Sequence, residues 1–167
     1  MADYYSAMIT NLDATPPAPA SALVHSSPVR CSFGVYETTD ATLGTSDSIR
    51  IARLPAQGYL LGCWFAFDDF GSTGDFNIGF HKPTYAGGTA IDANAIGTAV
   101  DVNAAAVALT NYRYETLAID TMDDPIWDLA TLTAAPAYHD IDISITPSEV
   151  TTAVGTIAWE IYYTDAV

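Results

Sequence analysis

The sequence has very little positive charge. Its 167 residues include only five lysines and arginines, against 20 aspartates and glutamates, which gives a formal net charge of -15. Such a surface repels phosphate groups, so the composition excludes a protein whose main task is to bind nucleic acid or an anionic membrane. Hydrophobic residues make up 50% of the chain, which is too much for a disordered protein and enough for a core. The composition therefore indicates one acidic domain with a hydrophobic core.

Cysteine and long hydrophobic runs are also scarce. The longest apolar run, residues 59–67, has about half the length that a membrane span requires. The first residues, Met-Ala-Asp-Tyr-Tyr, lack the basic and apolar regions of a secretory signal, so we expect no route to an oxidising compartment. Cys31 and Cys63 are therefore predicted to be buried, reduced thiols.

The sequence lacks the spacings that catalysis or metal binding requires. His25, His81 and His139 lie far apart, and no pair of them has zinc-ligand spacing. A G-x-S-x-G nucleophile motif and a phosphate-binding loop are both missing. We therefore predict no catalytic residues, no metal site and no cofactor, and we do not expect an enzyme. Acidic clusters at 68–69 and 120–124 are interpreted as solvated loops, with calcium binding left open.

The first 30 residues differ from the rest in composition. The segment Thr15-Pro-Pro-Ala-Pro-Ala is rich in proline, which removes backbone donors and favours an extended chain. We expect residues 1–30 to form an extended N-terminal arm and residues 31–167 to form one β-sandwich domain. The arm is predicted to pack on its own domain or on a neighbouring subunit, the alternative being a frayed terminus. Its apolar side chains are candidate interface residues: Tyr4, Tyr5, Met8, Ile9 and Leu12.

From residue 31 onward the hydrophobic pattern has a period of two, which is typical of strands. The clearest alternation is that of Ile141, Ile143 and Ile145 with polar residues. We predict six strands, at residues 31–38, 48–54, 59–68, 75–81, 138–146 and 155–164.

The middle of the chain is less regular. Residues 84–98 are interpreted as a long loop, and residues 102–109 as a short helix. Asp124 and Pro125 are interpreted as the N-cap and first residue of a helix of one or two turns. The sequence therefore predicts an all-β fold, a β-sandwich or jelly roll with one or two short helices in the middle.

The strand at residues 59–67 is apolar on both faces, which is typical of a strand central in its sheet or covered by a partner chain. Most aromatic residues of the strands are interpreted as core side chains. Trp64, Ala158 and Tyr162 lie on the opposite faces of their strands, away from the core side chains, and are candidates for a subunit interface. We therefore predict a homo-oligomer, a trimer, with a hydrophobic interface.

Several stretches resemble a group of small virion proteins of tailed phages. Residues 49–58 (Ile-Arg-Ile-Ala-Arg-Leu-Pro-Ala-Gln-Gly), followed by 61–69 and by Asp75-Phe-Asn-Ile-Gly, resemble three successive strands of that group. Residues 124–130 (Asp-Pro-Ile-Trp-Asp-Leu-Ala) resemble its short helix with a tryptophan, and residues 153–163 its final strand. The resemblance spans about residues 45–165 and rests on strand patterns.

The resemblance implies a head decoration (cement) or minor capsid protein. Such a protein is a β-sandwich that binds the outside of a capsid shell, commonly as a trimer, and has no catalytic residues. The expected partners are the major capsid protein and further copies of this chain, without nucleic acid or membrane. The expected location is the outer surface of the virion, after assembly in the host cytoplasm. Two alternatives remain open: a carbohydrate-binding module of tail-fibre or surface-lectin type, and another virion component of the tail or connector.

Overall fold

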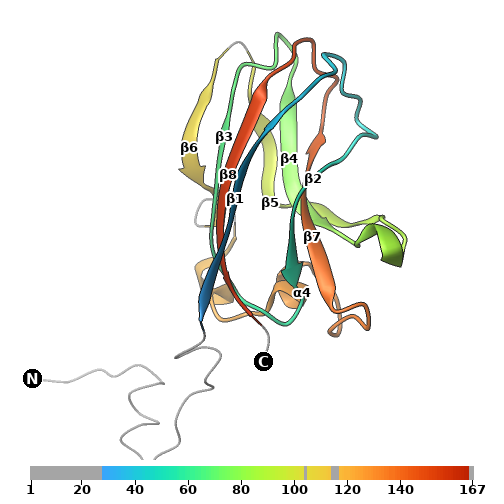
Figure 1. Cartoon of the computed structure of the whole chain (residues 1–167), viewed down its shortest axis with the longest axis vertical. Coiled ribbons are helices and arrows are strands. Elements are labelled where there is room, and N and C mark those ends of the chain that lie inside the picture. The colour runs from blue at the N-terminus through green and yellow to red at the C-terminus, as the bar shows by residue number, and fades with distance from the viewer. Residues whose placement is uncertain (1–27, 104, 114–116, 166–167) are drawn as a thin grey trace, which may run out of the picture.

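The computed structural model is a two-layer β-sandwich, and it describes residues 28–103, 105–113 and 117–165 (Figure 1). Eight strands pair in antiparallel fashion to form two four-stranded sheets. The strands are β1 (Val29–Glu37), β2 (Ile49–Pro55), β3 (Leu60–Phe67), β4 (Asp75–His81), β5 (Ala90–Asp101), β6 (Val107–Asn111), β7 (Asp140–Pro147) and β8 (Thr156–Thr164).

The strand order identifies the fold. The first sheet has the order β1-β8-β3-β6, and the second sheet has the order β2-β7-β4-β5. The first strand pairs with the last, the second with the last but one, and so on inward. The pairs are β1 with β8, β2 with β7, β3 with β6 and β4 with β5. The chain runs like one long hairpin, with its tip at β4 and β5, wrapped into two sheets. This is a jelly roll, so the predicted fold class is confirmed.

All six predicted strands are present, but two predictions for the middle of the chain are wrong. Strand β5 occupies most of residues 84–98, which the sequence presents as a loop. Its pairing with β4 shifts register three times, so the irregular strand shows no steady alternation. Strand β6 covers the end of residues 102–109, where the sequence predicts a helix, and continues to Asn111. The run of alanines at 104–106 favours a helix locally, but the segment after it pairs with β3 at the edge of the first sheet.

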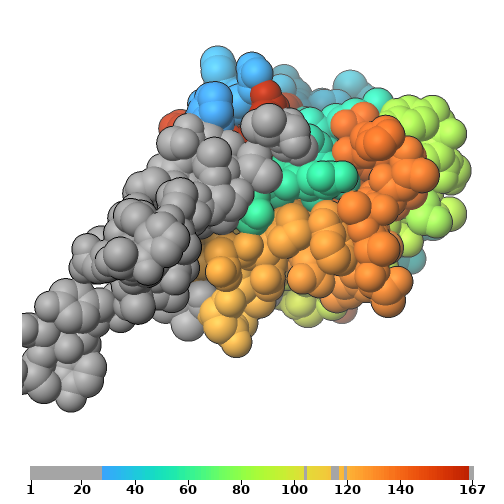
Figure 2. Space-filling view, turned by 90° about the horizontal axis from the view of Figure 1, so that it is seen from below, coloured from blue at the N-terminus to red at the C-terminus, as the bar shows by residue number. Residues whose placement is uncertain are grey.

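The predicted helix in the middle of the chain is confirmed as α4 (Ile126–Leu129). The sequence predicts Asp124 as the N-cap residue of this helix, but the N-cap residue is Pro125. The helix closes one end of the sandwich, because its N–H groups at Ile126 and Trp127 donate to the carbonyl oxygens of Gly58 (2.8 Å) and Ala56 (2.9 Å). Figure 2 shows this segment beside the turn between β2 and β3.

Two 3-10 turns, η1 (Thr84–Ala86) and η2 (Ile119–Thr121), lie in the connections from β4 to β5 and from β6 to α4. Across the part of the chain that the structure describes, no helix is long and apolar enough to cross a membrane.

The core lies between the two sheets and contains aromatic rings in contact with one another. The ring of Phe76 on β4 lies 5.6 Å from that of Phe67 on β3 and 4.8 Å from that of Phe70. Arg113, which follows β6, is fully buried. It donates to the carbonyl oxygens of Leu60 (3.1 Å) and Thr121 (2.7 Å), so its charged group is satisfied by backbone acceptors. Of the two explanations for the doubly apolar strand, a central position or cover by a partner chain, the central position is confirmed, since β3 lies between β8 and β6.

The register of β1 is set by a close contact between a glycine and a tryptophan. Gly34 lies opposite Trp159 of β8, and a Cβ atom at Gly34 would be 2.5 Å from Cζ2 of the Trp159 ring. A slip of one residue would place a branched or aromatic side chain where this ring lies. Phe33 and Val35 therefore point away from the second sheet.

The prediction for the two cysteines is confirmed in part. Both thiols are free, and Cys63 on β3 is buried. Cys31 is exposed, so its predicted burial is wrong. The physical reason is the register of β1, because Cys31 shares the outward side with Phe33 and Val35.

We expect Gly34→Val to lower the free energy of unfolding by about 1–3 kcal/mol, because the new side chain must displace the Trp159 ring. The matched control Gly44→Val, in a loop where a Cβ atom would meet only the Asp47 carboxylate at 3.6 Å, should change it by less than about 0.5 kcal/mol. Urea unfolding followed by fluorescence measures both. Equal stabilities of the two variants would contradict this account of the register.

Candidate interaction surface

The outer face of the first sheet, the side turned away from the second sheet, is apolar and open to solvent. Phe33 and Val35 on β1 are 78% and 68% exposed, and Leu109 on β6 is 54% exposed. Opposed residues in antiparallel strands share one face. Phe33 lies opposite Glu160 and Val35 opposite Ala158. The side chains of β1, β8 and β6 thus gather on this face, with β3 lying between β8 and β6.

These residues form a depression that we call the outer groove. Its floor is low because the two strands between β1 and β6 carry small residues there, Ala158 on β8 and, opposite it, Ala66 on β3. Ala158 also lines a second depression with Ala66 of β3 and Val107 of β6, so the groove continues across the sheet. The outer groove is lined by Phe33, Gly34, Val35, Leu109, Ala158, Trp159 and Glu160.

An exposed apolar surface of this kind is a candidate site of interaction with another molecule. The hydrophobic core is complete without Phe33, Val35 and Leu109, since it is built from the inner faces of both sheets. The outer groove therefore makes no evident contribution to the stability of the isolated domain. Its chemistry suits a protein segment with apolar side chains.

The structure brings two of the predicted interface residues together next to the outer groove. The rings of Trp64 and Tyr162 meet edge to face, with centroids 5.4 Å apart and planes at 85°. The Tyr162 hydroxyl donates to the carboxylate of Glu160, and this hydrogen bond is the main cause that raises the pKa of Tyr162 to about 12. Both side chains are half-buried on the outer face. The arm residues Tyr4, Tyr5, Met8, Ile9 and Leu12 lie outside the described residues.

Sequence reasoning did not identify Phe33, Val35 and Leu109 as surface residues. Alternation shows that a strand has two different faces, but it does not show which of them is buried. The one signal in the sequence is Gly34. A glycine between Phe33 and Val35 leaves room on its own face of β1 for a large side chain of the core, and this indicates that Phe33 and Val35 lie on the outer face.

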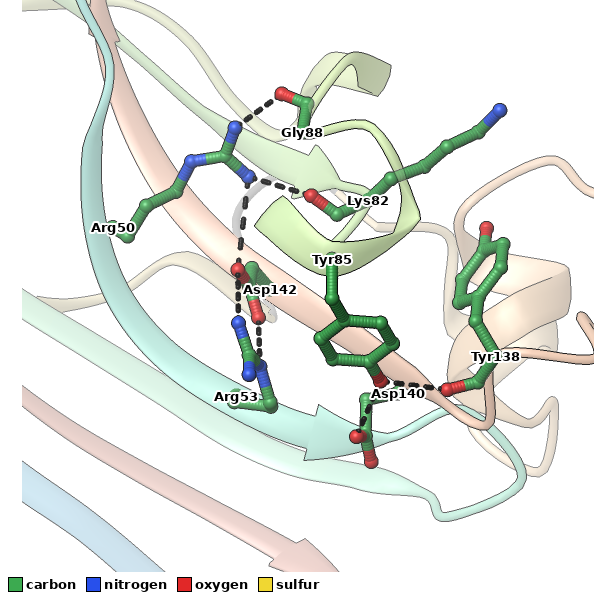
Figure 3. Close-up of polar contacts among 8 residues, drawn as sticks. All are labelled: Arg50, Arg53, Lys82, Tyr85, Gly88, Tyr138, Asp140 and Asp142. Atoms are coloured by element: carbon green, nitrogen blue, oxygen red, sulfur yellow. Dashed lines mark hydrogen bonds and ion pairs between the residues drawn. The ribbon is translucent and has the colours of Figure 1, made fainter.

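A polar cluster lies on the outer face of the second sheet (Figure 3). Arg53 on β2 makes two bonds to the carboxylate of Asp142 on β7, at 2.7 and 3.1 Å. Arg50 lies 3.8 Å from the same carboxylate and donates to the carbonyl oxygens of Lys82 (3.0 Å) and Gly88. Arg50 thus fastens the connection between β4 and β5 to the sheet, and Arg53 joins β2 to β7.

Tyr85, in that connection, adds to the same attachment (Figure 3). Its hydroxyl lies 2.7 Å from the carbonyl oxygen of Tyr138 and 2.8 Å from the carboxylate of Asp140. The guanidinium of Arg53 lies 5.2 Å from the centre of the Tyr85 ring, within the range of a cation–π contact. The cluster is therefore explained by its role in positioning the loop.

His81 and Ser144 form a buried pair beside this cluster, which the sequence did not reveal. The Ser144 hydroxyl and Nδ1 of His81 share a hydrogen bond. Burial, and then the positive charge of Arg50, lower the pKa of His81 to about 4, while Asp142 opposes this shift. Nucleophilic catalysis needs an accessible hydroxyl and a free carboxylate to orient the histidine. Here Ser144 has no exposed surface and Asp142 is held by Arg53, so the pair is structural.

Acidic residues of the loops bind backbone groups in the structure. Asp68 accepts the N–H of Thr156 at 3.0 Å, and Asp69 accepts the N–H of Gly71 at 2.7 Å. Among the described residues, no three His, Cys, Asp or Glu side chains are grouped to hold a metal ion.

Two solved structures are similar to this jelly roll. A chain of the structure described as "Cyanophage Pam1 capsid asymmetric unit" matches with a TM-score of 0.51 and 16% identity, over 84% of this chain and 86% of that chain. A chain of the structure "Capsid of Ralstonia phage GP4" matches with a TM-score of 0.49 and 15% identity, over 85% and 86%. No protein-family model and no curated protein matches the sequence. At 16% identity the likeness to the Pam1 chain shows the fold and not the function.

We expect His81 to make stability depend on pH between about 6.5, its ordinary pKa, and about 4. In this window the unfolded chain binds a proton at His81 that the folded chain does not. The free energy of unfolding therefore holds its full value with respect to His81 above pH 6.5 and decreases as the pH falls to 4. In His81→Asn this loss should disappear. Urea unfolding of both proteins at several pH values measures it, and parallel pH profiles would contradict the assignment.

Proposed function

We propose that this protein is a structural component of a phage virion, and that it is a decoration (cement) protein on the outer face of the capsid shell. The observation that carries the proposal is the outer groove, an apolar sheet face open to solvent on a strongly acidic sandwich. Phe33, Val35 and Leu109 form a surface for a protein partner, and the candidate partners are the major capsid protein and further copies of this chain.

The likeness in fold supports this proposal. The Pam1 structure is described as a capsid asymmetric unit, and its similarity to this chain extends over 84% of the sequence. The jelly roll is an architecture that viral capsid proteins use, although lectins use it as well. The resemblance of residues 45–165 to small tailed-phage virion proteins points in the same direction.

The charge favours a position outside the shell. A formal net charge of -15 repels the phosphates of packaged DNA, so the inner surface of a filled head is an unfavourable place for this domain. The outer surface imposes no such repulsion. Before assembly, the same charge keeps the free protein soluble.

The chemistry of the outer groove also favours a protein partner over a sugar. A carbohydrate site combines an aromatic platform with several polar groups that fix the sugar. Phe33 instead lies among Val35, Leu109 and Ala158, and the carboxylate of Glu160 is already bound by Tyr162. The lectin alternative is therefore the weaker one.

The proposal is tested by mass spectrometry of purified virions from the source of this gene. We expect the chain in a fixed ratio to the shell protein, and we expect heads that lack it to resist heat less well. Absence from virions would contradict the proposal. A few copies confined to the tail or connector would support the alternative of another virion component.

A matched pair of variants tests the role of the outer groove. Val35→Asp should weaken binding to preformed shells about tenfold or more, because a carboxylate would be buried without a partner. Val154→Asp makes the same change at an exposed valine in the loop before β8 and should leave binding unchanged. Sedimentation of protein with shells measures both. Equal binding of the two variants would exclude the groove as the contact.

A further inference from the structure

We infer that the outer groove receives the N-terminal arm of a second copy of this chain, residues 1–27. The inference rests on the role proposed above for the outer face as an assembly surface, and it names the occupant. It also specifies how copies would associate: each chain gives an arm to one neighbour and takes an arm from another.

The arm and the outer groove match in chemistry. Within nine residues the arm carries five large apolar side chains, from Tyr4 to Leu12. The outer groove presents Phe33 and Val35 on one side and Leu109 on the other, with the floor of Ala158 between them. A narrow segment of chain fits a groove of this shape, whereas a second flat sheet face would leave its floor uncovered.

The arm also carries much less negative charge than the sandwich domain. The arm contains two of the 20 acidic residues, Asp3 and Asp13, and no lysine or arginine. The other 18 acidic residues lie in residues 28–167, so contact between two sandwich domains is opposed by their like charge. The arm is the part of a second copy that can approach this face with the least repulsion.

The arm is long enough, and joins the sandwich at a suitable place, for its apolar residues to reach another domain. The described chain starts at Pro28, directly before β1, which is an edge strand. Leu12 precedes Pro28 by 16 residues, and such a segment spans at most roughly 55 Å. This exceeds the length of β1, roughly 30 Å for nine residues. The apolar residues can therefore reach a neighbouring domain.

The prolines favour a neighbour over the arm's own domain. The outer groove lies at Phe33 and Val35, so an arm that filled its own groove would have to reverse direction at Pro28. A residue before proline prefers an extended conformation, and the segment at 15–20 prefers the extended polyproline form. An arm passed to a neighbour is a head-to-tail contact, which closes into a ring such as the predicted trimer.

The test is disulfide trapping in the full-length protein, in a Cys31→Ser background that leaves the buried Cys63 in place. One preparation carries Met8→Cys and an affinity tag, and the other carries Leu109→Cys. After mixing and mild oxidation, the proposal predicts a linked heterodimer on a non-reducing gel. Its yield should be at least about tenfold above that of a control pair in which Val154→Cys replaces Leu109→Cys, because docking raises the local concentration of the thiols.

The other outcomes overturn the inference. A yield equal to that of the Val154→Cys control would show that the arm does not dock in the outer groove. A chain carrying both Met8→Cys and Leu109→Cys that links only within itself, even when concentrated, would show that each arm fills its own groove. Neither result bears on whether the protein occurs in virions, so failure of the inference and failure of the proposed function are distinguishable.

Discussion

A two-layer sandwich buries one face of each sheet, and every other feature of this molecule is arranged around that constraint. The inner faces supply a complete core, closed at one end by α4 and the turn between β2 and β3. The outer faces must be stable in water by themselves or be covered by something else. The second sheet meets this requirement with a network of charged and polar side chains around Asp142. The first sheet does not, and its exposed apolar residues are the basis of the functional interpretation.

The contact between Gly34 and Trp159 links the fold to this surface. It fixes the register of β1 against β8, which joins the two ends of the jelly roll. Successive side chains of a strand point to opposite faces of the sheet. Because Gly34 faces the core, its neighbours Phe33 and Val35 must face outward. The groove between β1 and β6 then results from the small side chain of Ala158 on the strand next to β1. The surface is therefore a consequence of packing on the opposite side of the sheet.

Much of the fold could be predicted from the sequence, and less of the surface. Strands such as β7, with Ile141, Ile143 and Ile145 in alternation, carry their own signal. Strand β5 does not, because its bulged pairing with β4 breaks the alternation, and β6 follows a run of alanines that locally favours a helix. Trp64 and Tyr162 were placed on the outer face by parity alone. Phe33, Val35 and Leu109 were missed because their exposure depends on long-range contacts that sequence periodicity does not contain.

The central claim is that the outer face of the first sheet is covered in the assembled particle. Hydroxyl-radical footprinting of purified virions tests it most directly, with the labelling of Phe33 compared with that of Tyr85 on the other side of the sandwich. Both are exposed in the isolated chain, at 78% and 61%. After each rate is normalised to that in the unfolded protein, the account predicts strong protection of Phe33 and little protection of Tyr85. Equal labelling of the two residues would contradict it.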